Sequence, residues 1–276
     1  MKQIFLTVVM VFAVFTLTQC QTPDKKTSQT SANKTSLSQS SEKKAGAFVD
    51  MTFTNASGEK MPYLLFIPKE YDKQKKYPLA LWLHGGGSRG NDPKRMLDYG
   101  DKHGIGFLAR NDNQSKYPSF VLAPQCPLNK YWADTDSETP TAQMKLVLEI
   151  LDKVQADYSI DTTRLYVMGI SLGGYGTWDI IARRPDTFAA AVPICGGGNS
   201  SKASQMVNTS IWAFHGDKDE AVNVSESRKM IDAIKTAGGK PRYTEYKGVG
   251  HNSWENAFAE IDLLPWLFAQ KKIGRQ

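Results

Sequence analysis

Hydrophobic positions after about residue 47 follow two different patterns, which alternate along the chain. Short apolar runs bounded by Gly, Pro or charged residues are typical of buried strands. Longer segments with apolar residues three and four positions apart are typical of helices. The predicted strands are 61–67, 79–83, 120–123, 164–168, 188–194, 211–214 and 242–246. The predicted helices are 142–154, 174–184, 224–236 and 254–270, the last with a kink at Pro265.

The alternation of apolar strands with helices predicts an α/β fold. Strands that are apolar throughout are typical of a mainly parallel sheet with helices covering both faces. In such sheets, binding and catalytic groups gather beyond the carboxyl ends of the strands. We therefore expect residues 47–276 to form one domain, with its chemistry in the loops that follow the strands.

The first 20 residues have the pattern of an export signal. Lys2 is followed by an apolar run over 4–17, which is shorter than the ~20 residues of a membrane-spanning helix but fits a signal-peptide core. Cys20 directly after this run predicts lipidation and a membrane anchor, although Gln19 departs from the small residue usual there. The alternative is an ordinary signal peptide. We expect a lipoprotein at the cell envelope or periplasm, or otherwise a secreted protein.

Residues 21–46 are rich in Ser, Thr, Gln and Lys and contain no aromatic residue, so they predict a flexible tether. The chain has a formal net charge of +6, but the first 46 residues contain six lysines and only two carboxylates. Most of the basic excess therefore lies outside the predicted domain. A tether beside a membrane accounts for this charge better than a nucleic-acid-binding face does.

The composition excludes several classes of protein. A hydrophobic content of 41% in 276 residues is enough for a core and excludes a wholly disordered chain. Three cysteines exclude a disulfide scaffold and a four-cysteine zinc site. Cys126 and Cys195 could pair or remain free thiols, and the sequence leaves both possibilities open. No acidic run has metal-loop spacing, so we expect neither a metal nor an organic cofactor.

The strongest chemical signal is the run Gly-Ile-Ser-Leu-Gly at 169–173. It lies between a predicted strand and a predicted helix, which is the context of a nucleophile elbow. There a sharp turn exposes the serine hydroxyl, and the flanking glycines avoid collisions with neighbouring backbone. We therefore predict that Ser171 is a nucleophile. The run His84-Gly-Gly-Gly87 follows an earlier strand and is of the type that supplies an oxyanion donor.

From about residue 50 to 270 the chain resembles the α/β-hydrolases. More narrowly, it resembles the secreted serine esterases grouped with feruloyl and acetyl-xylan esterases, polyhydroxybutyrate-depolymerase-like proteins and predicted peptidases. The runs that carry the resemblance are LHGGGSRG, LAPQCP with Trp132 following, GISLGGYGTWDIIARRPDTFAAAVPICGGG, HGDKDEAV and GVGHNSW. The resemblance implies the α/β-hydrolase fold, without a large lid, and a site accessible to bulky or polymeric esters.

The resemblance also implies the partners of Ser171, because this fold places its acid and then its histidine after the serine. His251, in a Gly-rich loop before the last helix, is the expected base. Asp219 is the expected acid, since its position in HGDKDEAV matches the acid loop, whereas Asp217 more plausibly shapes the turn. Glu220 is the remaining carboxylate in that loop.

The oxyanion donors are expected to be the backbone N–H of Leu172 and that of Gly86 or Gly87, and the sequence does not choose between the two glycines. His84 is expected to be a structural hydrogen-bonding residue rather than a second base. Three further residues are expected to line the substrate cleft: Gln125, Trp132 and Tyr175. For Trp132, packing beneath its polar loop is an equal alternative to an exposed stacking position.

We therefore predict a serine carboxylic ester hydrolase that works through an acyl-enzyme. Acetyl or feruloyl esters of carbohydrates are the substrates that the resemblance favours. One alternative is a serine peptidase of the prolyl-oligopeptidase type, although 276 residues leave no room for a propeller domain. Others are a non-catalytic surface binding protein on a hydrolase scaffold, which an intact Ser, Asp and His argue against, and an acyltransferase.

Overall fold

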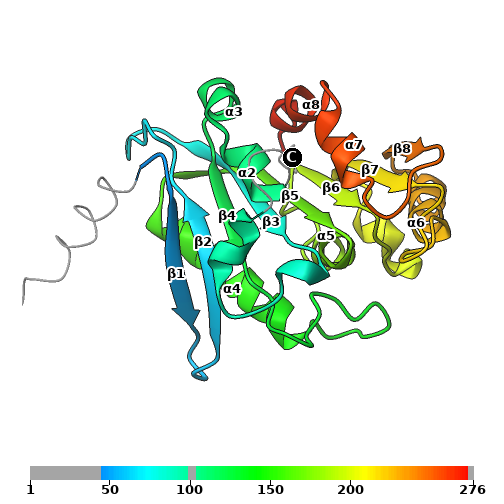
Figure 1. Ribbon diagram of the computed structural model, residues 1–276, viewed down its shortest axis with the longest axis horizontal. Coiled ribbons are helices and arrows are strands. Elements are labelled where there is room, and N and C mark those ends of the chain that lie inside the picture. Colours follow the sequence, from blue (N-terminus) through cyan, green and yellow to red (C-terminus); the bar gives the residue numbers. More distant parts are fainter. Residues whose placement is uncertain (1–44, 99–103, 273–276) are drawn as a thin grey trace, which may run out of the picture.

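A computed structural model describes residues 45–98 and 104–272 of the chain (Figure 1). Its centre is an eight-stranded sheet with the order β1-β2-β4-β3-β5-β6-β7-β8. The strands are β1 (Phe48–Thr54), β2 (Lys60–Phe66), β3 (Tyr77–Leu83), β4 (Phe120–Pro124), β5 (Ile160–Ile170), β6 (Ala190–Ile194), β7 (Ser210–Gly216) and β8 (Arg242–Tyr246). The predicted signal, the tether and Cys20 lie outside the described residues.

The sheet is parallel from β4 through β8 and antiparallel only at its first edge. β1 pairs with β2, and β2 with β4, in antiparallel register, whereas β3 pairs in parallel with both β4 and β5. β6, β7 and β8 continue the parallel order. The predicted fold class, an α/β-hydrolase fold with a mainly parallel sheet, is therefore confirmed.

Helices cover both faces of the sheet. The α-helices are α2 (Gly104–Ala109), α3 (Asn111–Lys116), α4 (Ala142–Asp157), α5 (Leu172–Arg183), α6 (Ser225–Thr236), α7 (Trp254–Ala259) and α8 (Leu263–Ala269). Short 3₁₀ turns are η1 (Gly86–Ser88), η2 (Pro93–Leu97) and η4 (Ser200–Gln205). In Figure 1, α4 and α5 lie below the strands, and α7 and α8 lie above them.

The core is accordingly divided into two layers by the sheet. Along β3, Leu79 and Leu81 pack with α4, α5 and α6, whereas Ala80 and Trp82 pack with α2, α7 and α8. Alternate side chains of a strand point to opposite faces, so a strand covered on both sides must be apolar at every position. This explains the continuous apolar run of β3, in which all seven residues are buried.

The predicted final helix over 254–270 is wrong in one respect. The structure contains two helices, α7 and α8, which are separated at 260–262. Pro265 is the third residue of α8, in the first turn, where a missing N–H costs no intrahelical hydrogen bond. Pro265 therefore lies in the first turn of a separate helix, α8, and does not kink a continuous helix. Across residues 45–98 and 104–272, no helix combines the length and the apolar character needed to cross a bilayer.

Candidate active site

Ser171 occupies the single-residue turn between β5 and α5. Its φ of 52° and ψ of −115° lie outside the regions that L-residues normally adopt. The turn is held by the N–H of Ser171, which donates to the carbonyl oxygen of Ile194 on β6 at 2.9 Å. A strained residue held by its surroundings is typical of a functional site. In this conformation the Ser171 hydroxyl lies within hydrogen-bond distance of His251.

The glycines on either side of Ser171 are required by close packing. A Cβ at Gly173 would lie 1.8 Å from the carbonyl oxygen of Leu83, and one at Gly169 would lie 2.2 Å from that of Gly173. Both contacts are with backbone, which has no flexible side chain to move aside. The two glycines let α5 start directly against the end of β3.

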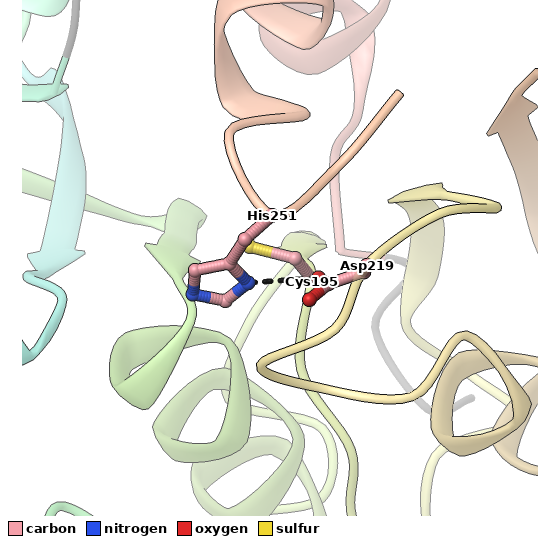
Figure 2. A group of neighbouring side chains, drawn as sticks. All are labelled: Cys195, Asp219 and His251. Atoms are coloured by element: carbon pink, nitrogen blue, oxygen red, sulfur yellow. Dashed lines mark hydrogen bonds and ion pairs between the residues drawn. The ribbon is translucent and has the colours of Figure 1, made fainter. Parts of the chain in front are cut away.

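The structure brings Ser171, His251 and Asp219 into one chain of hydrogen bonds. His251 Nε2 lies 2.8 Å from Ser171 Oγ, and its Nδ1 lies 2.8 Å from Asp219 Oδ2. Because a carboxylate accepts, Nδ1 carries the hydrogen and Nε2 is free to accept the serine proton. Asp219 comes from the loop after β7, and His251 comes from the loop before α7. Figure 2 shows their side chains pointing toward each other.

The carboxylate of Asp219 is saturated with hydrogen bonds. Its Oδ1 accepts from the backbone N–H groups of Ala221, at 2.9 Å, and Val222, at 2.8 Å. Burial by itself would raise the pKa of Asp219, but the hydrogen bonds from Val222 and His251 outweigh it, so that the pKa is lowered. Asp219 therefore remains ionised and can stabilise a positive charge on His251.

The other two carboxylates of this loop lie elsewhere. Asp217 Oδ1 accepts from the backbone N–H of Gly248 at 2.6 Å and thereby ties the loop after β7 to the loop that carries His251. The side chain of Glu220 is exposed. The hydrogen bond of Asp217 shapes the turn in the way expected from the sequence.

His215 is a member of this network that the sequence analysis missed. Its Nε2 lies 3.1 Å from Asp219 Oδ2 and 2.9 Å from the carbonyl oxygen of Val222. Since both neighbours are acceptors, Nε2 must carry a hydrogen. Burial lowers the pKa of His215, which keeps the ring neutral. The signal that could have revealed it is its position at the end of a strand, four residues before the acid.

The side chain of Cys195 lies beside those of His251 and Asp219 (Figure 2). One ligand-type atom from each of the three residues lies within 4.8 Å of the others. Burial raises the pKa of the Cys195 thiol to about 12, so it is protonated at neutral pH and is a poor metal ligand and nucleophile. Cys126 is likewise buried, and the two cysteines are free thiols rather than a disulfide.

His84 organises the Gly-rich loop after β3. Its Nδ1–H donates to the carbonyl oxygen of Gly85 at 2.7 Å, and its Nε2 accepts from the N–H of Cys126 at 2.9 Å. Its own carbonyl oxygen accepts from Trp132 Nε1 at 3.0 Å. Both ring nitrogens are thus occupied by backbone, and His84 has the structural contacts expected from the sequence.

We predict that His84 makes the folded domain sensitive to acid. Burial lowers its pKa from 6.5 to about 4, and in the unfolded chain the pKa returns to 6.5. The unfolded chain therefore binds more protons between these values, and His84 should cost about 3 kcal/mol of unfolding free energy as the pH falls from 7 to 4. Urea unfolding at a series of pH values measures this loss.

The matched variant is His84→Gln, which cannot take up a proton. It should be less stable than the wild type at pH 7, yet its stability should fall less steeply toward pH 4. If the two stability curves run parallel over this range, His84 does not contribute to the pH dependence.

Of the three residues expected to line a cleft, the structure places only Tyr175 in a cavity wall. Trp132 is fully buried beneath its loop, so the expectation of an exposed stacking position is wrong and the packing alternative holds. Gln125 is also fully buried, and its Nε2 donates to the carbonyl oxygens of Ser88 and Asp92. Both residues lie beneath the loops around the site and support them through these hydrogen bonds.

Two cavities meet at Ser171. An enclosed one of about 300 Å³ is lined by apolar groups that include Trp82, Met96 and Trp254, together with His251. An open one of about 790 Å³ is lined largely by polar residues of the loop between β4 and α4, together with Leu172 and Tyr175. Gly86 borders both cavities, whereas Gly87 borders only the enclosed one.

Comparison with known proteins finds similarity to hydrolases and esterases. Residues 127–260 match the dienelactone hydrolase family. The chain is 30% identical to a probable feruloyl esterase C of Aspergillus terreus over 64% of its own length and 62% of the relative's. It is 27% identical to feruloyl esterase D of Neurospora crassa over 68% of its own length and 63% of the relative's.

A crystal structure of a thermostable esterase superposes on 81% of the chain, with a TM-score of 0.76 and 39% identity, and the chain covers 63% of that protein. The chain thus spans under two thirds of the length of each of these proteins. The family match, over residues 127–260, includes the positions of Ser171, Asp219 and His251.

Proposed function

Because this chain belongs to the α/β-hydrolase superfamily, we propose that it is a carboxylic ester hydrolase with Ser171, His251 and Asp219 as its catalytic triad. The observation that carries the proposal is the hydrogen-bond chain from Asp219 through His251 to Ser171, which ends where two cavities meet. The similar proteins, two feruloyl esterases and a thermostable esterase, favour ester substrates.

In the first half of the reaction, Ser171 Oγ attacks the ester carbonyl carbon while His251 Nε2 takes the hydroxyl proton. Asp219 stabilises the imidazolium through Nδ1–H without itself taking the proton. Collapse of the tetrahedral intermediate breaks the ester C–O bond, and His251 returns the proton to the leaving alcohol. Water then repeats the sequence on the acyl-enzyme and releases the acid.

The negative oxygen of the intermediate is held by two backbone donors. Leu172 is the first residue of α5, so its N–H has no partner within the helix and lies at the positive end of the helix dipole. Gly86 supplies the second donor, because it borders both cavities at Ser171 while Gly87 borders one. Preorganised donors of this kind are among the largest contributions to ester hydrolysis.

The substrates we propose are acetyl or feruloyl esters of carbohydrates. The enclosed cavity of about 300 Å³ suits a compact acyl group, and its two indoles suit an aromatic one. No cofactor takes part in the proposed reaction. Export of the enzyme through residues 1–20, with membrane attachment through Cys20, remains a prediction from the sequence.

A panel of substrates tests the reaction class. The full-length protein should hydrolyse p-nitrophenyl acetate, methyl ferulate and acetylated xylan. Its kcat/KM on short peptide amides should be at least about 100-fold lower. Peptide cleavage as fast as ester cleavage would favour the prolyl-oligopeptidase-type alternative. Binding to xylan without hydrolysis of any ester would favour the non-catalytic alternative.

A further inference from the structure

The loop between β4 and α4 presents two adjacent aromatic side chains in opposite directions. Trp132 is fully buried and donates from Nε1 to the carbonyl oxygen of His84. Tyr131 is 57% exposed and lines the open cavity that also contains Ser171. An exposed large aromatic residue in a cavity wall beside a nucleophile is a candidate contact for a ligand.

The surrounding structure anchors the loop that carries Tyr131. The buried Trp132 anchors the loop on one side, and Asn129 holds a turn with a φ of 56° on the other. The guanidinium carbon of Arg89 lies 5.5 Å from the centre of the Tyr131 ring, within the range of a cation–π contact. A side chain held in this way loses little conformational freedom when a ligand binds.

Arg89 adds unused hydrogen-bond donors to the same wall. Its Nε donates to the carbonyl oxygen of Gly86 at 3.1 Å, and its Nη1 donates to that of Lys130 at 3.3 Å. Within the described ranges, no carboxylate lies close enough to form an ion pair with Arg89. Its remaining N–H groups can therefore donate to oxygen atoms of a ligand.

We propose that the open cavity is a sugar-binding subsite for the alcohol part of the substrate, with Tyr131 as its stacking platform. This proposal rests on the proposed ester hydrolysis and names the residues that select the substrate. A sugar ring has one apolar face of C–H groups, which suits the Tyr131 ring, and a rim of hydroxyl groups, which suits Arg89 and the phenol of Tyr175.

The two cavities then divide the ester between them. The sugar lies against the polar wall of the open cavity, whose volume of about 790 Å³ admits more than one ring. The acyl group lies in the enclosed cavity. The ester carbonyl lies between them, at Ser171, which borders both. An ester of a simple alcohol such as methanol makes no use of the Tyr131 wall.

The test compares Tyr131→Ala with the wild type on two esters of the same acid. On a feruloylated or acetylated xylo-oligosaccharide, kcat/KM should fall about 10-fold or more, because the stacking surface is removed. On the corresponding methyl ester, kcat/KM should change by less than about 2-fold. Leu128→Ala is the matched control: Leu128 is 64% exposed on the same loop and lines neither cavity, so both ratios should remain near the wild-type value.

Further measurements separate stacking from other roles of Tyr131. Tyr131→Phe should retain most of the activity on the sugar ester, and a loss as large as that of Tyr131→Ala would overturn the stacking role. If Tyr131→Ala lowered kcat/KM equally on both esters, or did not lower it on the sugar ester, the proposed subsite would be overturned.

A binding experiment keeps the subsite testable without turnover. The Ser171→Ala variant, with and without Tyr131→Ala, is titrated calorimetrically with a short xylo-oligosaccharide. Binding that weakens about 10-fold without Tyr131 supports the subsite, and binding that is absent or unchanged overturns it. Failure of the wild type to cleave even the methyl ester is a separate result, which would contradict the proposed ester hydrolysis.

Discussion

The Ser171→Ala variant should lose at least about 10⁴-fold in kcat on p-nitrophenyl acetate while keeping the folded structure of the domain. In the proposed mechanism, the substitution removes the atom that bonds to the acyl group, and it leaves His251 with no hydroxyl to deprotonate. The residual activity of the variant is the part that the oxyanion donors and substrate binding provide. Steady-state kinetics on the purified full-length protein measure the loss.

Two controls make the result specific to Ser171. Ser115→Ala changes a serine on α3 whose hydroxyl donates to the carbonyl oxygen of Asn111, and it should leave kcat unchanged. A serine-directed phosphonylating reagent should modify the wild type at one position and should not modify Ser171→Ala. Activity above about 1% of the wild-type value in the variant would show that another residue is the nucleophile.

The Asp219→Asn variant should lose about 10⁴-fold in kcat. The amide oxygen can replace Oδ1 and accept from Ala221 and Val222, which directs the amide N–H₂ toward His251. His251 Nδ1 must then accept, so its Nε2 carries the hydrogen. The imidazole is thereby held in the tautomer that cannot take the proton of Ser171.

Asp217→Asn is the matched control for this substitution. Asp217 lies two residues away in the same loop, and its Oδ1 accepts a hydrogen bond from the backbone N–H of Gly248. An asparagine oxygen can accept the same hydrogen bond, so kcat should stay within a few-fold of the wild-type value. A large loss in Asp217→Asn together with a small loss in Asp219→Asn would reverse the assignment of the acid.

Much of the sheet could be predicted because its strands are buried on both faces. The runs ending at Leu83 and Ile194 are apolar at every position, and a short run of this kind is typical of a strand that is covered on both faces. β1 was not predicted because the prediction rested on runs that are apolar throughout, whereas this half-exposed edge strand alternates apolar and polar residues. The break between α7 and α8 was misplaced because a proline can either kink a helix or lie in its first turn, and Pro265 does the latter.

The candidate site could be located from sequence because its geometry depends on local motifs. The elbow around Ser171 needs small neighbours, and those glycines can be read directly. The orientation of Trp132 could not be read, because a loop has no periodicity and the distant carbonyl oxygen of His84 decides which aromatic turns inward. His215 was missed for a related reason: its role exists only once β7 and its loop bring it against Asp219.

The opposite orientations of Trp132 and Tyr131 separate two properties that selection can act on. A change of codon 131 alters the wall that faces solvent, whereas the indole beside it continues to hold His84 and the Gly-rich loop in place. Neighbouring positions in the gene thus evolve under different constraints.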